Sequence, residues 1–264
     1  MVQKTLQLHR RGLLSGLLAL AFILSLFSVD WGKGLLHPGG GASILKIIQG
    51  FFQPALSPDI LILALHSSWI TLVYAVAGMS LAFLLAILLG VLASGVLAEK
   101  TIRRAFSMAG FRGILGFMRA IHELVWAWLF VAAIGLSPFA AILAIAIPYG
   151  GILGRIFADM LNDVPQEPIR ALQANGANRL QLLFYGYLPM AAADMVSYTM
   201  YRFECAIRSS AIMSFVGLGG LGFQIQLSLA DLRYDEVWTF LFFLIGLVVL
   251  VDYWSQLLRK RLVA

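Results

Sequence analysis

Of the 264 residues, 61% are hydrophobic and only 12% are charged, and the mean hydropathy is +0.89. An average soluble domain has a charged fraction of about 25%, so a soluble fold with this composition would expose large apolar surfaces. The composition therefore predicts a single integral membrane domain whose apolar surface is covered by lipid. The single Cys205 excludes an internal disulfide and a cysteine-based metal cluster within one chain.

The net charge of +6 and the sequence pI near 9.7 have two possible explanations. Nucleic-acid binding calls for basic runs interleaved with aromatic residues, and no such run occurs, so we expect no nucleic-acid partner. Basic residues gathered on the cytoplasmic side of a membrane protein explain the charge better. The four histidines are scattered without metal-ligand spacing, and we expect no metal site and no catalytic residues.

The N-terminal quarter predicts an anchor followed by a connector. Gly12 to Val29 is uncharged and follows Arg10 and Arg11; it is longer than the apolar region of a usual signal peptide and has no A-x-A-like end, so we expect an uncleaved first span. The connector runs from Asp30 to Asp59 and contains a short apolar patch, Ile44 to Phe52, which we expect at the interface or against the bundle. We assign residues 1–66 to this anchor and external connector, and residues 67–264 to the main domain.

The rest of the chain predicts the remaining spans of an all-α membrane protein with about six transmembrane helices. We expect one span from Ser68 to Val96, although the uncharged run begins at Ile60. We expect two helices within the next apolar region, the first beginning near Arg119 and the pair turning at Gly135 to Pro138, because proline breaks helices. The last two spans are expected at Ala191 to Phe215 and at Val237 to Leu258.

The distribution of basic residues predicts the orientation. With the N- and C-termini in the cytoplasm, most Lys and Arg residues fall in cytoplasmic segments, and the outer segments hold only Lys33, Lys46 and Arg233. This bias agrees with the positive-inside rule.

The polar segment 162–190 lies between two spans on the positive side. Small residues at Ala171 and Ala177 leave a surface that another protein can approach closely, and Gly176 permits a sharp turn between two short helices. The alternative is an ordinary amphipathic cytoplasmic loop, and physical arguments alone favour neither interpretation.

This segment resembles the EAA loop of ABC importer permeases. Ala171, Gly176, Ala177, Leu188 and Pro189 match that motif, whereas Arg170 stands where glutamate is usual and Leu172 replaces the second alanine. The stretches Phe117 to Ala144 and Tyr201 to Gly222 resemble permeases of the phosphonate or phosphite type, and together the similar region covers more than half of the chain.

The resemblance implies a fold with the methionine-importer-like (MetI-like) permease core and transport of a phosphorus oxyanion across the cytoplasmic (inner) membrane. It also implies a second copy of this chain, ABC ATPase subunits bound at the loop, and an extracytoplasmic substrate-binding protein. The chain has no G-x-x-x-x-G-K-[S/T] motif, so we expect ATP and Mg on the partner subunit and no cofactor or enzyme activity here. The alternatives are an ABC permease for another small solute, such as an amino acid, or a secondary transporter.

Charged residues within the fifth predicted span are candidates for the pathway or for an intramembrane pair. Arg202, Glu204 and Arg208 are ionisable, and such residues within a span usually face a partner or an aqueous route. Glu204 and Arg208 are four residues apart, in the favourable order for a helical ion pair, and we favour that pairing. Both arginines would also suit an oxyanion.

Two further groups remain. Gly217, Gly219 and Gly222 satisfy a dinucleotide-type spacing, but they follow a membrane helix rather than a strand. We therefore expect Gly217, Gly219, Gly220 and Gly222 to form an outer break or gate. His122 and Glu123 could relay protons, but we favour a role in capping and anchoring a helix.

Overall fold

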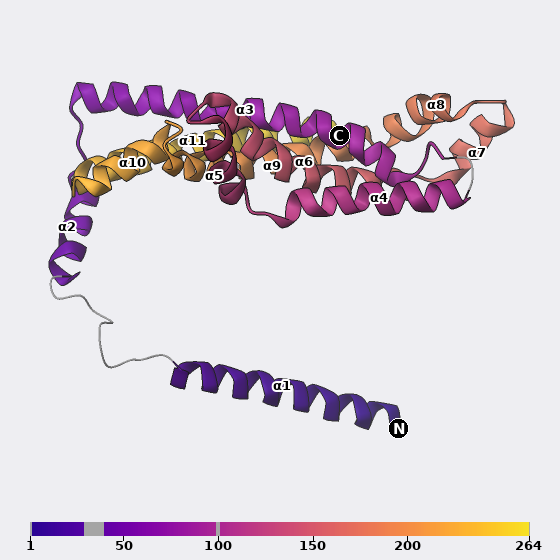
Figure 1. Cartoon of the computed structure of the whole chain (residues 1–264), viewed down its shortest axis with the longest axis horizontal. Coiled ribbons are helices and arrows are strands. Elements are labelled where there is room, and N and C mark those ends of the chain that lie inside the picture. Colours follow the sequence, from indigo (N-terminus) through magenta and orange to yellow (C-terminus); the bar gives the residue numbers. More distant parts are fainter. Residues whose placement is uncertain (1, 29–39, 99–100, 264) are drawn as a thin grey trace. The chain divides into compact units, whose positions relative to one another are not determined.

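The computed structural model describes residues 2–28, 40–98 and 101–263 (Figure 1). Every regular element within these ranges is a helix, which confirms the predicted all-α class. The first third of the predicted connector, residues 30–39 with Lys33, lies outside the described residues. The helices are α1 (Val2–Ser28), α2 (Gly40–Phe52), α3 (Pro58–Ser94), α4 (Thr101–Ala120), α5 (Glu123–Ile134), α6 (Pro138–Asp163), α7 (Gln166–Ala174), α8 (Arg179–Leu182), the π-helix η1 (Leu183–Tyr187), α9 (Leu188–Met213), the 3₁₀ helix η2 (Ser214–Val216), α10 (Leu221–Ala230) and α11 (Tyr234–Val263).

The chain divides into two units, Met1–Ile48 and Gln49–Ala264. The first unit contains α1, whose apolar stretch Gly12–Ser28 coincides with the first predicted span. Its large apolar side chains are exposed, as expected of a helix that lies in lipid. In the second unit, the end of α2 packs on α11: the Phe51 and Trp238 ring centroids are 4.8 Å apart, and Ala55 N–H donates to the Asp235 carbonyl.

The second unit contains the helices that cross the membrane. Helices α3, α6 and α11 are each long and apolar enough to span it. Two further pairs qualify as bent spans, α4 with α5 at 86° and the α9 segment with α10 at 44°, so the described residues hold up to five such spans. The apolar stretch of α1, Gly12–Ser28, is shorter than these spans, so the sixth span stays a prediction.

The third helix begins earlier than predicted. We expected a span from Ser68, but α3 is continuous from Pro58 to Ser94, 37 residues in all. Pro58 occupies the first turn, where its missing N–H costs no helical hydrogen bond, and Asp59 places a negative charge at the positive end of the helix dipole. The uncharged run therefore forms one helix without an irregular start.

The helix predicted to begin near Arg119 is broken instead. Helix α4 ends at Ala120, and α5 begins at Glu123 after a sharp change of direction. Figure 1 shows α5 lying across the direction of the neighbouring long helices. His122 caps α5, since its Nδ1 accepts a hydrogen bond from Leu124 N–H at 3.3 Å. The predicted capping role of His122 is thus confirmed, but at a break within the unit rather than at the end of a full span.

Small residues spaced four apart bring α3 and α6 together. On both helices these residues are buried, and on each they form one face. A Cβ added to Gly90 would lie 2.9 Å from the Gly154 carbonyl oxygen, so the two backbones are in direct contact there. This is the close packing that small residues allow between membrane helices. The small residues are Gly78, Ala82, Ala86 and Gly90 on α3, and Ala146, Gly150, Gly154 and Ala158 on α6.

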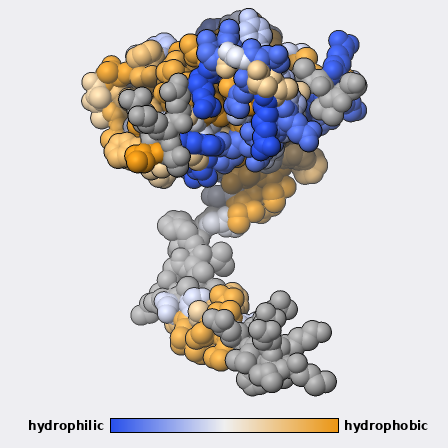
Figure 2. Space-filling model, turned by 90° about the vertical axis from the view of Figure 1, so that its right-hand side faces the viewer, coloured by the Kyte–Doolittle hydropathy of each residue, from blue (hydrophilic) through white to orange (hydrophobic). Residues whose placement is uncertain are grey.

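The end of the second unit that carries α7 and α8 is polar. Figure 2 views the molecule toward this end, and hydrophilic residues gather on the face that it presents. Apolar side chains such as Leu84, Leu88 and Val249 are exposed along the spanning helices instead. The polar end is therefore suited to water and the helical sides to lipid.

Gly90→Ala should destabilise the protein because the new methyl group would collide with the Gly154 carbonyl on α6. Overpacking of this kind costs about 1–3 kcal/mol. Gly246→Ala is the matched control on α11: no heavy atom lies within 4 Å of its added Cβ, and alanine favours a helix by about 1 kcal/mol over glycine. Thermal unfolding in detergent should show a lower midpoint for the first variant only. Equal midpoints would contradict the close α3–α6 contact.

Candidate functional site

The loop between α6 and α9 consists of α7, α8 and η1. Gly176 ends the first helical part with φ +81°, a conformation that suits glycine, and Ala177 N–H donates back to the Leu172 carbonyl at 3.1 Å. Asn178 then begins α8 with a capping box, because its side chain and that of Gln181 each accept a backbone N–H. The two short helices predicted around Gly176 are therefore present.

Apolar anchors hold this loop in place. Ile169, Leu182 and Leu183 are buried, and a Cβ added to Gly186 would lie 2.6 Å from the Ile169 Cδ1 atom. Helix α7 and η1 are consequently in close contact.

The predicted contact residues of the loop differ in exposure. Arg170, Ala171, Gly176 and Pro189 are exposed, whereas Ala177 and Leu188 are half-buried. A cavity of about 290 Å³ opens beside Gly176 and is lined by Leu172, Asn175, Ala177, Gln181 and Tyr185. The loop thus offers an exposed and concave surface on rigid supports.

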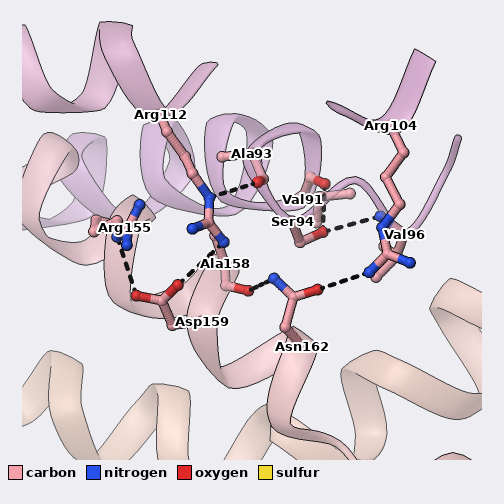
Figure 3. A network of polar contacts seen from close by, with 10 residues as sticks. All are labelled: Val91, Ala93, Ser94, Val96, Arg104, Arg112, Arg155, Ala158, Asp159 and Asn162. Carbon is pink, nitrogen blue, oxygen red and sulfur yellow. Dashed lines mark hydrogen bonds and ion pairs between the residues drawn. The ribbon is translucent and has the colours of Figure 1, made fainter. Parts of the chain in front are cut away.

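An ion network joins α3, α4 and α6 (Figure 3). Asp159 accepts from Arg112 at 3.2 Å and from Arg155 at 3.0 Å, and Arg112 Nε also donates to the Ala93 carbonyl in the last turn of α3. That carbonyl belongs to the helix end, where no helical partner is available. The network links the last turn of α3 and the C-terminal part of α6 to the middle of α4. A neighbouring cavity of about 270 Å³, lined by residues that include Arg104, Asn162, Arg179 and Tyr187, connects these helix ends with the loop.

The predicted pair between Glu204 and Arg208 is wrong. Glu204 Oε1 instead accepts from Arg259 Nη2 of α11 at 2.8 Å, and its side chain is 12% exposed. Arg208 is exposed and points to its own helix, with Nη2 3.7 Å from Cys205 Sγ. The i,i+4 spacing permits the predicted pair, but the long Arg259 side chain reaches the partly buried carboxylate from a second helix.

Arg202 is held by tyrosines. Its Nε and Nη2 atoms donate to the Tyr198 hydroxyl at 2.9 and 2.7 Å. Its guanidinium carbon also lies 5.2 Å from the Tyr198 ring centroid and 5.5 Å from that of Tyr201, within cation–π range. Arg202 is therefore oriented by neutral groups.

Sequence reasoning missed a polar cluster between α5, α6 and α9. Ser209 Oγ donates to Glu123 Oε1 at 2.7 Å and lies 2.9 Å from the Tyr149 hydroxyl, while His122 Nε2 is 3.7 Å from Glu123 Oε2. Ser209 and Tyr149 are buried. No sequence spacing links these residues, because they lie on three helices, and only the break at His122 and Glu123 gave a signal.

The glycine-rich segment is a break in the chain path between α9 and α10, as its sequence predicts. Gly217, Gly219 and Gly220 have positive φ values of 93°, 81° and 92°. Thr71 on α3 ties this break to the bundle: its Oγ1 accepts from Leu221 N–H at 3.0 Å and its carbonyl accepts from Ser210 Oγ at 2.9 Å. Gly222 lies within α10, where an added Cβ would collide with the Ala211 carbonyl. The gating role of these glycines stays a prediction.

Taken together, an all-helical core of apolar spans with an exposed, anchored loop between two of them defines the class of polytopic membrane proteins. The chain belongs to the family of binding-protein-dependent transport system inner membrane components, whose model matches residues 86–264.

Individual relatives agree with this family. The chain is 31% identical to the phosphite transport system permease protein PtxC of Stutzerimonas stutzeri, over 88% of this chain and 83% of the relative. It is also 31% identical to the putative cryptic phosphonate transport system permease protein PhnE2 of Escherichia coli, over 46% of this chain and 99% of that protein. A solved chain of the MetNI methionine ABC transporter, in an inward-facing conformation, shares the fold with a TM-score of 0.69 and 23% identity, over 78% of this chain and 99% of that one. The predicted MetI-like core is confirmed.

The ion pair between α9 and α11 can be tested with double-mutant cycles. Glu204→Gln and Arg259→Gln should each destabilise the chain, and their combination should cost less than the sum, with a coupling of about 0.5–3 kcal/mol. Glu204→Gln combined with Arg208→Gln should be additive, because Arg208 does not contact that carboxylate. Thermal unfolding of all variants measures both cycles. Coupling to Arg208 without coupling to Arg259 would contradict the pairing.

Proposed function

We propose that this chain is the transmembrane permease subunit of an ABC importer that carries phosphite, phosphonates or a related phosphorus oxyanion across the inner membrane. The observation that carries the mechanism is the exposed loop α7–η1, held by buried anchors between two spans and matching the EAA pattern at Gly176, Ala177, Leu188 and Pro189. The substrate class is supported by the phosphite and phosphonate permeases to which the chain is similar.

The partners follow from this role. An ABC ATPase subunit binds the exposed loop, a substrate-binding protein docks on the opposite outer side, and a second copy of the chain completes the pathway within membrane lipid. ATP and Mg belong to the ATPase subunit. The N- and C-termini lie in the cytoplasm, which agrees with the basic residues Arg104, Arg112, Arg155 and Arg179 around the loop end.

Transport then proceeds by alternating access. ATP binding closes the ATPase pair and draws the two loops together, and the network around Asp159 passes this movement to α3, α4 and α6. The helices rock from an inward-open to an outward-open state, the binding protein releases its substrate, and hydrolysis returns the helices. An ion-driven secondary transporter is disfavoured because the family consists of binding-protein-dependent systems.

ATP hydrolysis by the reconstituted complex tests this proposal. The chain, with the ATPase and binding protein encoded beside it, is placed in liposomes with phosphite, methylphosphonate, phosphate or methionine. We expect ATP hydrolysis to rise several-fold with a phosphorus oxyanion and only when the binding protein is present. Stimulation by methionine alone would contradict the substrate class, and failure to assemble with the ATPase would contradict the ABC role.

Gly176→Val should weaken docking of the ATPase. Gly176 has φ +81°, which a β-branched residue adopts only with strain, so the loop surface beside the cavity should change shape. We expect at least a tenfold loss of co-purified ATPase with unchanged gel-filtration behaviour of the permease. Gly113→Val on α4 is the control, because an added Cβ there meets no heavy atom within 4 Å. Full transport by the Gly176 variant would contradict the assignment of the coupling loop.

A further inference from the structure

Helix α9 carries two positive side chains that no described carboxylate neutralises. The described salt bridges involve other residues, including the pair of Glu204 with Arg259, and neither Arg202 nor Arg208 takes part in any of them. Arg202 binds a phenol and two ring faces, and Arg208 contacts a thiol. An unpaired guanidinium in contact with hydrocarbon is costly, so the unoccupied donors of Arg202 and Arg208 must meet water or an anion.

The two guanidiniums and Cys205 belong to one continuous polar surface. Cys205 lies between Arg202 and Arg208 in sequence, three residues from each, and is half-buried. Arg202, Cys205 and Arg208 thus form a polar surface along α9, and the next residue, Ser209, belongs to the cluster with Glu123 and Tyr149.

From this arrangement we propose that Arg202 and Arg208 are successive contacts for the anion in transit, on a face of α9 that lines the pathway. This inference rests on the proposed importer function. The Cα atoms of Arg202 and Arg208 are six positions apart, which is about 9 Å along the helix axis, so the two side chains form two stations for a small anion. The planar guanidinium suits the oxygens of phosphite or a phosphonate and remains charged at every relevant pH.

The neighbouring groups keep each contact weak, as a transit site requires. Two donors of Arg202 are already engaged by the Tyr198 hydroxyl, which leaves fewer for the anion. The Glu123 carboxylate, held by Ser209, lowers the positive potential at the end of the surface. A site that binds its ion too tightly would stop conduction, so this balance favours passage over storage.

Cys205 is the chain's only cysteine and reports directly on this surface. In the assembled transporter in detergent, the rate of Cys205 modification is measured with an anionic sulfonatoethyl and a cationic trimethylammonioethyl methanethiosulfonate. Each rate is divided by the reagent's rate with free mercaptoethanol. We expect the anionic reagent to be favoured about tenfold, the difference that one nearby positive charge produces in water, and phosphite to slow it.

Arg202→Gln and Arg208→Gln should each reduce this preference several-fold, whereas Lys260→Gln, which removes an exposed charge near the C-terminus, should leave it unchanged. Arg202→Lys should retain most of it. A Cys205 that is inert to both reagents, or a preference that does not depend on either arginine, would overturn the inference. The reactivity of Cys205 is measured on the wild-type protein, so that outcome can be read even if a variant fails to fold. An arginine-dependent preference that sulfate or glutamate lowers and phosphite does not would support the anion surface and contradict the proposed substrate.

Discussion

The direct contact between α3 and α6 is the constraint on which the rest of the unit depends. In a membrane, apolar side chains gain little by leaving lipid for protein, so helices associate through close packing. The small residues around Gly90 and Gly154 allow the two backbones to touch, and α4, α5 and α9 pack against this pair. The same helices carry the Thr71 tie to the glycine break and the Asp159 network near the loop.

Polar groups are distributed unevenly over this frame. At the loop end, Asp159 accepts from two arginines, and the network links α3, α4 and α6. Along α9, by contrast, Glu204 is neutralised by Arg259 while Arg202 and Arg208 retain their charge without a described acid. On α9, the acidic Glu204 is thus paired, whereas the basic Arg202 and Arg208 form no described ion pair. This division separates residues that hold the fold from those proposed to meet the substrate.

Local patterns were predictable from the sequence, and contacts between distant helices were not. The loop around Gly176 and the glycine break at Gly217 depend on residues a few positions apart, so their spacing indicated them. The partner of Glu204 depends on how α9 and α11 lie against each other, which no local pattern encodes. The break before α5 was missed because an uncharged run follows it without an intervening proline, and the cluster of Glu123, Ser209 and Tyr149 needs three helices to form.

The most direct test of the central claim is accumulation of phosphite in liposomes that contain this chain, its ATPase and its binding protein. If the chain is part of an ATP-driven importer, phosphite accumulates above its external concentration. This accumulation requires both ATP and the binding protein, and it continues when ion gradients are collapsed. Phosphite uptake that persists without ATP, or that disappears with the ion gradient, would contradict an ATP-driven importer and favour a secondary transporter.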